Sequence, residues 1–179
     1  MKRTLLRFEN LQQIAGTDEV AVIVLTDTAR RRALSIVCDY DMMRQLLHRL
    51  QGNRDVTRTM LPEALLQLMP SSYEMLIAGI HDGQYQVVLM DTDNGQSVRI
   101  RMSDAVLLSV ISHVPLFIEE GLMRRQSFAF DENAPGICIP INTMDTVRLK
   151  AALQSAVEDE NYELASQLRD EINSRKQTS

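Results

Sequence analysis

The C-terminal segment from Thr143 to Lys176 constrains the fold of this 179-residue chain more than any other part. Apolar residues recur there at three- and four-residue steps in two stretches, which predicts two short amphipathic helices joined by the polar turn Glu158–Asn161. Two helices of about four turns cannot bury enough surface to be stable alone, so we expect this hairpin to pack on its own domain, on a second copy or on another protein. The apolar stripes consist of Leu149, Ala152, Leu153, Ala156 and Val157 on the first helix and Leu164, Ala165, Leu168 and Ile172 on the second.

The sequence of this hairpin is more specific than amphipathicity alone requires. Leu149-x-x-x-Leu153 is followed by Glu160-Asn161-Tyr162-Glu163-x-Ala165 and then by Leu168-Arg169-Asp170-Glu171-Ile172. This pattern resembles the UVR motif, a helical hairpin shared by the excision-repair proteins UvrB and UvrC and by some regulators of Clp-type proteases. Ser166 stands where the family usually has a second alanine. The resemblance implies a protein-binding hairpin, whose partner-binding residues would be Leu149, Leu153, Tyr162, Ala165, Leu168, Arg169 and Ile172.

Composition limits the classes of protein to which the chain can belong. A hydrophobic fraction of 45% is ample for a folded core, and a formal net charge of −5 argues against a surface that coats polyanions non-specifically. The clusters Arg30–Arg32 and Arg124–Arg125 form either local basic spots or solvated ends of elements. No apolar run is long enough for a membrane span and no signal segment is recognisable, so we expect a cytoplasmic protein. Cys38 and Cys138 lie far apart among apolar neighbours, which predicts buried thiols rather than a zinc site.

The rest of the chain predicts an α+β fold, in which helices pack on a mostly antiparallel mixed sheet and the α-helical hairpin follows. Val20–Thr26 is almost wholly apolar and is expected to be a strand buried on both faces. Asp82-Gly83 and Asn94-Gly95 separate three β-rich segments, which indicates a three-stranded meander. Other expected strands are Thr4–Phe8, Ala33–Cys38 and Val114–Ile118.

Three helices are expected before the hairpin. The first is capped by Asp39 or Asp41, and the second opens at Pro62 with Leu65, Leu66 and Met69 as its buried face. The third is capped by Ser103 and runs to about His113. Turn-forming residues in Phe128–Pro140 indicate a connecting segment, so the predicted divisions are a domain at 1–130, a linker at 131–142 and the hairpin at 143–177.

A second resemblance covers most of the predicted domain, from about residue 10 to residue 130. Arg101-Met102-Ser103-Asp104-Ala105, followed by Val114-Pro115-Leu116-Phe117-Ile118 and Glu120, resembles the signature of the bifunctional nuclease family, and Ile80-x-Asp82-Gly83-x-Tyr85 matches the hairpin that precedes it. Members are described as cleaving both RNA and DNA, and some carry a C-terminal UVR hairpin. The resemblance implies phosphodiester hydrolysis assisted by a divalent ion, Mg²⁺ or Mn²⁺. The implied site residues are Asp104 as metal ligand or base, Arg101 as phosphate contact, Glu120 as a further catalytic residue and Asp82 as a second metal-ligand candidate.

The chain departs from the family pattern at two places. Asp39 stands where members usually have a glycine, and Met42 stands at a usual glutamate unless the register slips to Asp41. Pro62 and Glu63 replace the histidine and aspartate of a Thr-His-Asp segment. If that segment serves the active site, this protein has lost a proton-transfer or metal-ligand group.

Ordinary structural roles compete with the catalytic ones. Asp104 in a first helical turn and an Arg101–Asp104 salt bridge are common helix chemistry, and Asp91 and Asp93 suit the turn at Asn94-Gly95. The histidines, at positions 48, 81 and 113, form no cluster, and no glycine-rich phosphate loop suggests a nucleotide cofactor.

Two functions therefore remain open. A nuclease predicts at least three charged side chains converging in one open cleft around Asp104, with nucleic acid as the substrate. A non-catalytic dimeric adaptor, which recruits a DNA-repair or Clp-type protease partner, predicts Asp104 held by Arg101 or by backbone amides. We expect a homo-oligomer and a protein partner for the hairpin.

Overall fold

The computed structural model describes residues 2–14, 20–51, 61–69, 72–112, 114–132 and 140–178. The strands are β1 (Arg3–Gln13), β2 (Val20–Asp27), β3 (Arg32–Asp39), β4 (Tyr73–His81), β5 (Gln84–Asp91), β6 (Ser97–Ile100), β7 (Leu116–Glu119) and β8 (Phe128–Ala129). The helices are α1 (Tyr40–Leu50), α2 (Leu61–Leu68), α3 (Met102–Ile111), α4 (Glu120–Gln126), α5 (Thr146–Glu158) and α6 (Tyr162–Thr178), with a short 3₁₀ helix η1 at Ile141–Thr143.

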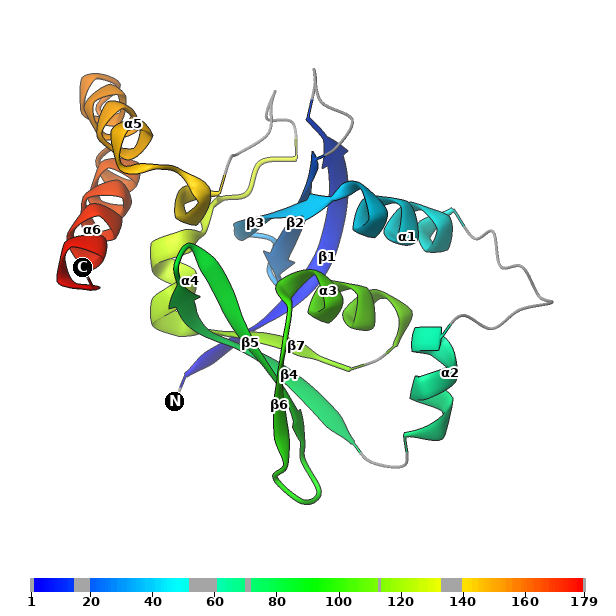
Figure 1. The fold of residues 1–179 in the computed structure, drawn as a ribbon. Coiled ribbons are helices and arrows are strands. Elements are labelled where there is room, and N and C mark those ends of the chain that lie inside the picture. Colours follow the sequence, from blue (N-terminus) through cyan, green and yellow to red (C-terminus); the bar gives the residue numbers. More distant parts are fainter. Residues whose placement is uncertain are drawn as a thin grey trace.

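These strands form one mixed sheet in the order β6-β5-β4-β7-β1-β2-β3-β8 (Figure 1). β4 and β7 are parallel and the other neighbouring strands are antiparallel, so the expected α+β class with a mostly antiparallel sheet is confirmed. The meander β4-β5-β6 also forms as expected. Asp82 and Gly83 both have positive φ in its first turn, as the Asp-Gly sequence predicts for a tight hairpin.

β2 is buried on both faces, as its apolar sequence predicts. Ile23 and Leu25 point into the main core, whereas Val22 and Val24 belong to a smaller cluster that Phe128 helps to cover. Because successive strand residues face opposite sides of a sheet, a strand with both faces covered needs a continuous apolar run.

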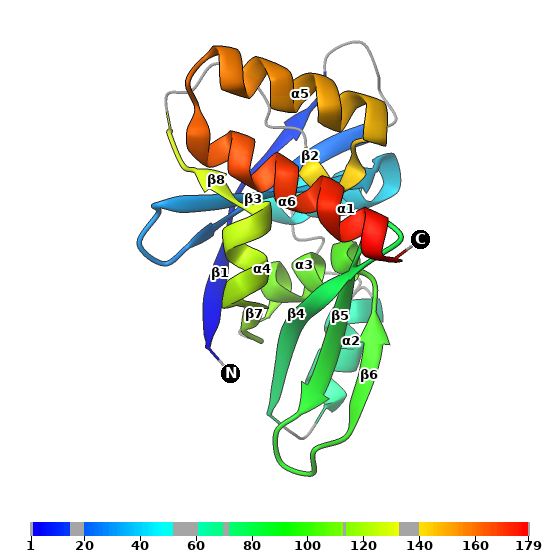
Figure 2. The same cartoon turned by 90° about the vertical axis from the view of Figure 1, so that its left-hand side faces the viewer.

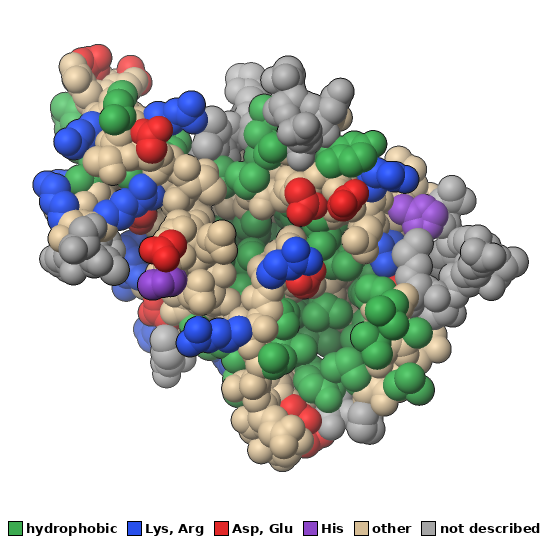
Figure 3. Space-filling model, viewed as in Figure 1, with side chains coloured by type: hydrophobic (Ala, Val, Ile, Leu, Met, Phe, Trp, Pro, Cys, Tyr) green, Lys and Arg blue, Asp and Glu red, His purple; other side chains and the backbone are tan. Residues whose placement is uncertain are grey.

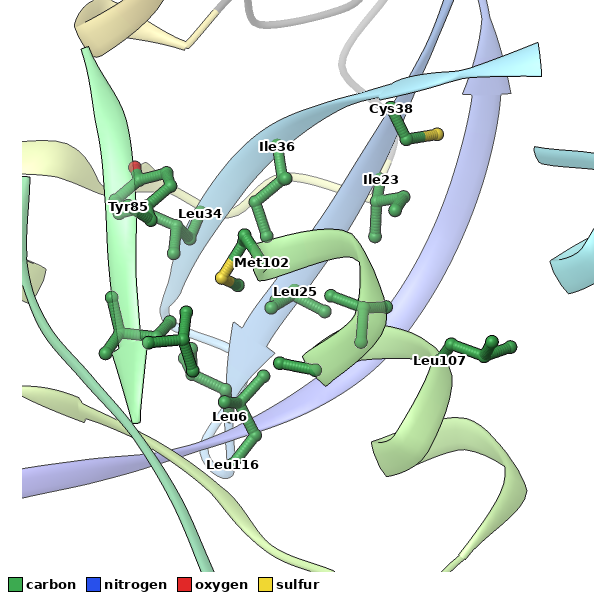
Figure 4. Close-up of a cluster of buried hydrophobic side chains, with 14 of the residues drawn as sticks. Leu6, Ile23, Leu25, Leu34, Ile36, Cys38, Tyr85, Met102, Leu107 and Leu116 are labelled. Atoms are coloured by element: carbon green, nitrogen blue, oxygen red, sulfur yellow. The ribbon is translucent and has the colours of Figure 1, made fainter. Parts of the chain in front are cut away.

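The main core is centred on α3, which contacts α1 and four strands, β1, β3, β5 and β7. Figure 4 shows Met102 and Leu107 of this helix with Leu25 of β2 and Leu116 of β7 in the same cluster. Removing such side chains from water is the principal source of stability for a fold of this kind. Met102, the first residue of α3, is buried, whereas Arg101 before it is exposed.

Of the two predicted helix caps, one is wrong and one is confirmed. Arg101, not Ser103, precedes the first turn of α3, and it makes no side-chain capping hydrogen bond. Asp39 does cap α1, accepting a hydrogen bond from the backbone of Met42 at 2.8 Å.

The predicted buried face of α2 is also wrong. Of the three predicted residues, Leu65 is 52% exposed, whereas Leu66 and Met69 are half-buried. Leu61 and Leu68 are 71% and 80% exposed. The apolar spacing was correct for a helix, but α2 is short and makes few contacts with the other described elements. Hydrophobic side chains therefore spread over the face of the molecule that carries α2 and α3 (Figure 3).

The hairpin of α5 and α6 packs against its own domain, one of the three arrangements that its sequence allowed. Figure 2 shows α6 crossing close to α4, and residue contacts join these two helices. The turn before α6 begins with Glu158, the last residue of α5, and contains Glu160 in the left-handed region, with φ of 56°. Ile141, which the predicted divisions assign to the linker, packs in the apolar cluster of the hairpin.

Gly83 lies where the β4–β5 turn meets the segment that leads into the hairpin. Its φ is +72°, and a Cβ at this position would lie 3.0 Å from the carbonyl oxygen of Asn142. The Asn142 side chain in turn donates a hydrogen bond to the Gly83 carbonyl at 2.7 Å.

We expect Gly83→Ala to lower the free energy of unfolding by about 1–2 kcal/mol or more, because a side chain is strained at positive φ and also crowds Asn142. Denaturant unfolding provides the measurement. Gly79→Ala is the matched control, since nothing lies within 4 Å of a Cβ there. Equal stability changes in the two variants would contradict this role for Gly83.

Candidate functional site

Arg101 and Asp104 form the centre of the site that the sequence predicts. The Arg101 Nε and Nη2 atoms donate hydrogen bonds to the two carboxylate oxygens of Asp104, at 2.9 and 3.1 Å. Basic and acidic side chains lie side by side over the start of α3 in Figure 3. The paired geometry is the bidentate fork that arginine makes with carboxylates, in which each oxygen of Asp104 accepts one hydrogen bond from Arg101.

Asp39 is the other acidic group near Arg101. The hydrogen bond to Asp104 is the largest cause of a raised pKa at Arg101, and the charge of Asp39 raises that pKa further. Asp39 also accepts the capping hydrogen bond at the start of α1. Asp39, which stands at the position of the usual family glycine, thus places a second carboxylate within electrostatic reach of Arg101. The sequence alone does not indicate this proximity.

Glu120 and Asp82, the other predicted catalytic and metal-binding residues, belong to different parts of the surface. Glu120 begins α4, where its backbone amide donates to the carbonyl of Lys2 at 3.1 Å. Asp82 occupies the β4–β5 turn, is almost fully exposed and lies 3.3 Å from the His81 ring nitrogen. Among the described residues, no interaction joins either carboxylate to the Arg101–Asp104 pair.

The donor set does not fit a divalent metal ion within the described residues. Mg²⁺ and Mn²⁺ require several oxygen ligands, usually including more than one carboxylate. No group of three or more acidic, histidine or cysteine side chains comes together there in a way that could hold a metal. Asp104 is held by arginine, and Asp82 extends from a turn elsewhere.

The other titratable residues considered from the sequence either have structural roles or lie outside the described residues. Cys38 is buried, as the sequence predicts, and burial raises the pKa of its thiol to about 11, which disfavours the reactive thiolate. Cys138 and His113 lie outside the described residues. Glu119 caps α4 by accepting hydrogen bonds from Gly121 and Leu122, and these bonds lower the pKa of its carboxyl group.

Most of the predicted partner-binding residues form the interior of the hairpin. Leu149, Ala165, Leu168 and Ile172 are buried in one apolar cluster, against which Leu153 is packed. The other two, Tyr162 and Arg169, are exposed, with Tyr162 at 69%. In this arrangement the accessible part of the predicted set is therefore limited to Tyr162 and Arg169.

The hairpin is attached to the domain mainly at the C-terminal end of α4. The Gln167 side-chain amide donates hydrogen bonds to the carbonyl oxygens of Arg124 and Ser127, at 3.0 and 2.8 Å. The Gln126 amide donates to the Glu171 carboxylate at 2.9 Å. The side chain of Gln167 thus occupies carbonyl groups that the end of a helix leaves without helical partners.

These attachment residues were missed in the sequence, although one signal was present. Gln167 and Glu171 are four residues apart, so they lie on the same side of α6. Their positions border the apolar stripe defined by Leu164, Leu168 and Ile172. Polar side chains beside a buried stripe indicate a docking surface, but they do not identify the surface that they meet.

No described helix combines the length and apolarity that crossing a bilayer requires.

Comparison with known families supports both resemblances in the expected order. The bifunctional nuclease domain model matches residues 23–133, and the UvrB/UvrC motif matches residues 147–177. A search of curated proteins finds no match. Because the first match covers more than half of the chain, this protein belongs to the bifunctional nuclease domain family and carries a UVR motif after that domain.

Proposed function

We propose that this protein is a non-catalytic adaptor of the bifunctional nuclease family, which uses its UVR hairpin to bind a partner protein. The observation that carries the proposal is the bidentate pairing of Arg101 with Asp104. A metal ion at Asp104 would have to compete with the Arg101 guanidinium for both carboxylate oxygens. This arrangement is what the adaptor hypothesis requires of Asp104.

The sequence departures support the same proposal. Pro62 and Glu63 replace the histidine and aspartate of the family segment. In the structure, Glu63 accepts hydrogen bonds from Arg49 at 2.6 and 3.1 Å. Hydrogen bonding to Arg49 is also the main cause of its lowered pKa. A carboxylate held in its charged form by arginine is suited to joining α1 to α2, and it is poorly suited to proton transfer near neutral pH.

The accessible face of the hairpin supports a role in binding. Tyr162 and Val157 are exposed at the end where the two helices join, beside Glu158, Asp159 and Glu160. Large exposed apolar groups with a polar surround are typical of protein-interaction sites. The partner would belong to a DNA-repair or Clp-type protease system, the two settings in which UVR motifs occur. Homo-oligomer formation remains a prediction.

A nuclease is the second candidate, and one observation favours it. Asp39 and Asp104 both act on Arg101 electrostatically, so two carboxylates lie within electrostatic reach of one arginine near the start of α3. If Arg101 turned toward a substrate phosphate, the Asp104 carboxylate would be released.

Cleavage of labelled single-stranded RNA and DNA with Mg²⁺ or Mn²⁺ distinguishes the candidates. We expect the wild-type protein and Asp104→Asn to give equally low cleavage, because Asp104 serves as the salt-bridge partner of Arg101. Circular dichroism checks that both proteins are folded. Wild-type cleavage that is lost in Asp104→Asn would instead establish a nuclease that uses this residue.

The adaptor proposal also makes a positive prediction for the hairpin. Purified UvrB, UvrC and Clp ATPase from the same organism are tested for binding by calorimetry. We expect one of them to bind, and Tyr162→Ala to weaken that binding about tenfold, as truncation of a central aromatic contact commonly does. Lys150→Ala, an exposed change on α5, is the control. Binding of none of these proteins, or equal binding to both variants, would contradict the proposed partner class or surface.

A further inference from the structure

A groove lies between α4 and α6, where the nuclease-type domain meets the hairpin. Its volume is about 470 Å³. Figure 2 shows the two helices on this side of the molecule, with β3 and β8 next to them. The lining includes Arg32 of β3, Arg124 and Arg125 of α4, and Glu163 and Asp170 of α6. The groove therefore combines side chains from both units and exists only while the hairpin is docked.

Arg32 is held in place by the end of α4. Its Nε atom donates to the Ser127 hydroxyl at 2.6 Å, and its Nη2 atom donates to the Ser127 carbonyl at 2.8 Å. The remaining nitrogen donates to Glu163 across the groove at 2.6 Å. Glu163 is well exposed, so this last hydrogen bond lies close to solvent. Of the three, it is the one that a ligand can replace most easily.

Arg124 and Arg125 supply the other positive charges. Both side chains are exposed, and neither forms an ion pair within the part of the chain that the structure describes. Among the side chains that line the groove, three arginines stand against two carboxylates. The Glu119 carboxylate lies beyond the lining next to Arg125. Hydrogen bonds from Gly121 and Leu122 lower its pKa most, and the charges of Arg125 and Arg124 contribute to lowering it. The excess of arginine on the lining contrasts with the net charge of −5 for the whole chain.

We infer that this groove binds one phosphate group and that the docked hairpin completes the site. Guanidinium groups match the geometry of phosphate oxygens, and a phosphate can bridge two of them. A phosphodiester carries one negative charge, which matches the excess of one arginine over the carboxylates of the lining. A ligand that carried a carboxylate would compete with Glu163 for the Arg32 guanidinium, to which Glu163 is already bonded. The site is separate from the Arg101–Asp104 pair, so it goes beyond the proposed adaptor function and does not depend on catalysis.

The phosphate can belong to a single-stranded nucleic acid or to a small free phosphate, and the experiment separates these sources. Binding of a fluorescein-labelled single-stranded DNA octamer is measured by anisotropy in EDTA, and binding of AMP and of inorganic phosphate is measured by calorimetry. We expect the double variant Arg124→Ala, Arg125→Ala to lose at least about tenfold in affinity for one of these probes. The control Lys150→Ala, Lys176→Ala removes two exposed positive charges from the hairpin outside the groove, and we expect less than about a twofold change.

The source follows from which probe responds. A loss confined to the octamer identifies a phosphodiester, whereas a loss for AMP or inorganic phosphate identifies a free phosphate ligand. Arg124→Lys, Arg125→Lys keeps both charges at the end of α4, and we expect it to bind with intermediate affinity because the fork is lost. Gln167→Ala tests the contribution of docking, and we expect it to weaken the same probe without removing a charge.

Three results would overturn phosphate binding by the groove, and a fourth would overturn the role of the hairpin. One is an equal loss in the groove and control variants, which would indicate a general charge effect. Another is the absence of binding to all three probes. The third is displacement of the bound probe by polyglutamate as effectively as by phosphate, which would indicate an acidic-peptide site. An unchanged affinity in Gln167→Ala would remove the hairpin from the site.

Discussion

Ser127 is the residue through which the domain and the hairpin are joined, and the arrangement of three elements depends on its hydrogen bonds. Its hydroxyl donates to the Met123 carbonyl at 2.5 Å and accepts from Arg32 at 2.6 Å. Its carbonyl accepts from both Arg32 and Gln167 at 2.8 Å. The side chain is fully buried, so each of these groups would be costly to leave without a partner. β3, α4 and α6 are thereby held around one point.

This attachment differs in kind from the packing within each unit. The domain has its main apolar cluster around α3, and the hairpin has a separate cluster that extends from Ile141 to Ile172. Arg175 closes the hairpin unit by donating to the carbonyl oxygens of Ile141, Asn142 and Met144. Between the units the described contacts are largely hydrogen bonds and the Arg32–Glu163 ion pair. Polar interfaces of this type are characteristic of units that can separate, which suits a hairpin with a role in binding a partner.

The sequence predicts the fold well where the pattern is local. The two apolar stripes, the Asp-Gly turn and the continuous run of β2 each follow from one physical rule, and each is present, except that Val157 of the first stripe is exposed. It fails for Leu65 of α2, because spacing identifies an apolar face without showing that another element covers it. It also omits α4, whose seven residues are too few for a helical period to be clear. At the candidate site, Arg101 and Asp104 are correctly paired because they are three residues apart. The contribution of Asp39 and the meeting of Arg32 with Gln167 arise from tertiary packing, which no local pattern contains.

We conclude that Gln167 and the end of α4 hold the hairpin on its own domain. Hydrogen–deuterium exchange of the wild-type protein and Gln167→Ala tests it most directly, because exchange reports local opening segment by segment. In Gln167→Ala we expect faster exchange in α6 and in the last turn of α4 than in the wild-type protein, with exchange in β2 and α3 unchanged. Identical exchange in both proteins would contradict the claim, and so would a uniform increase over the whole molecule.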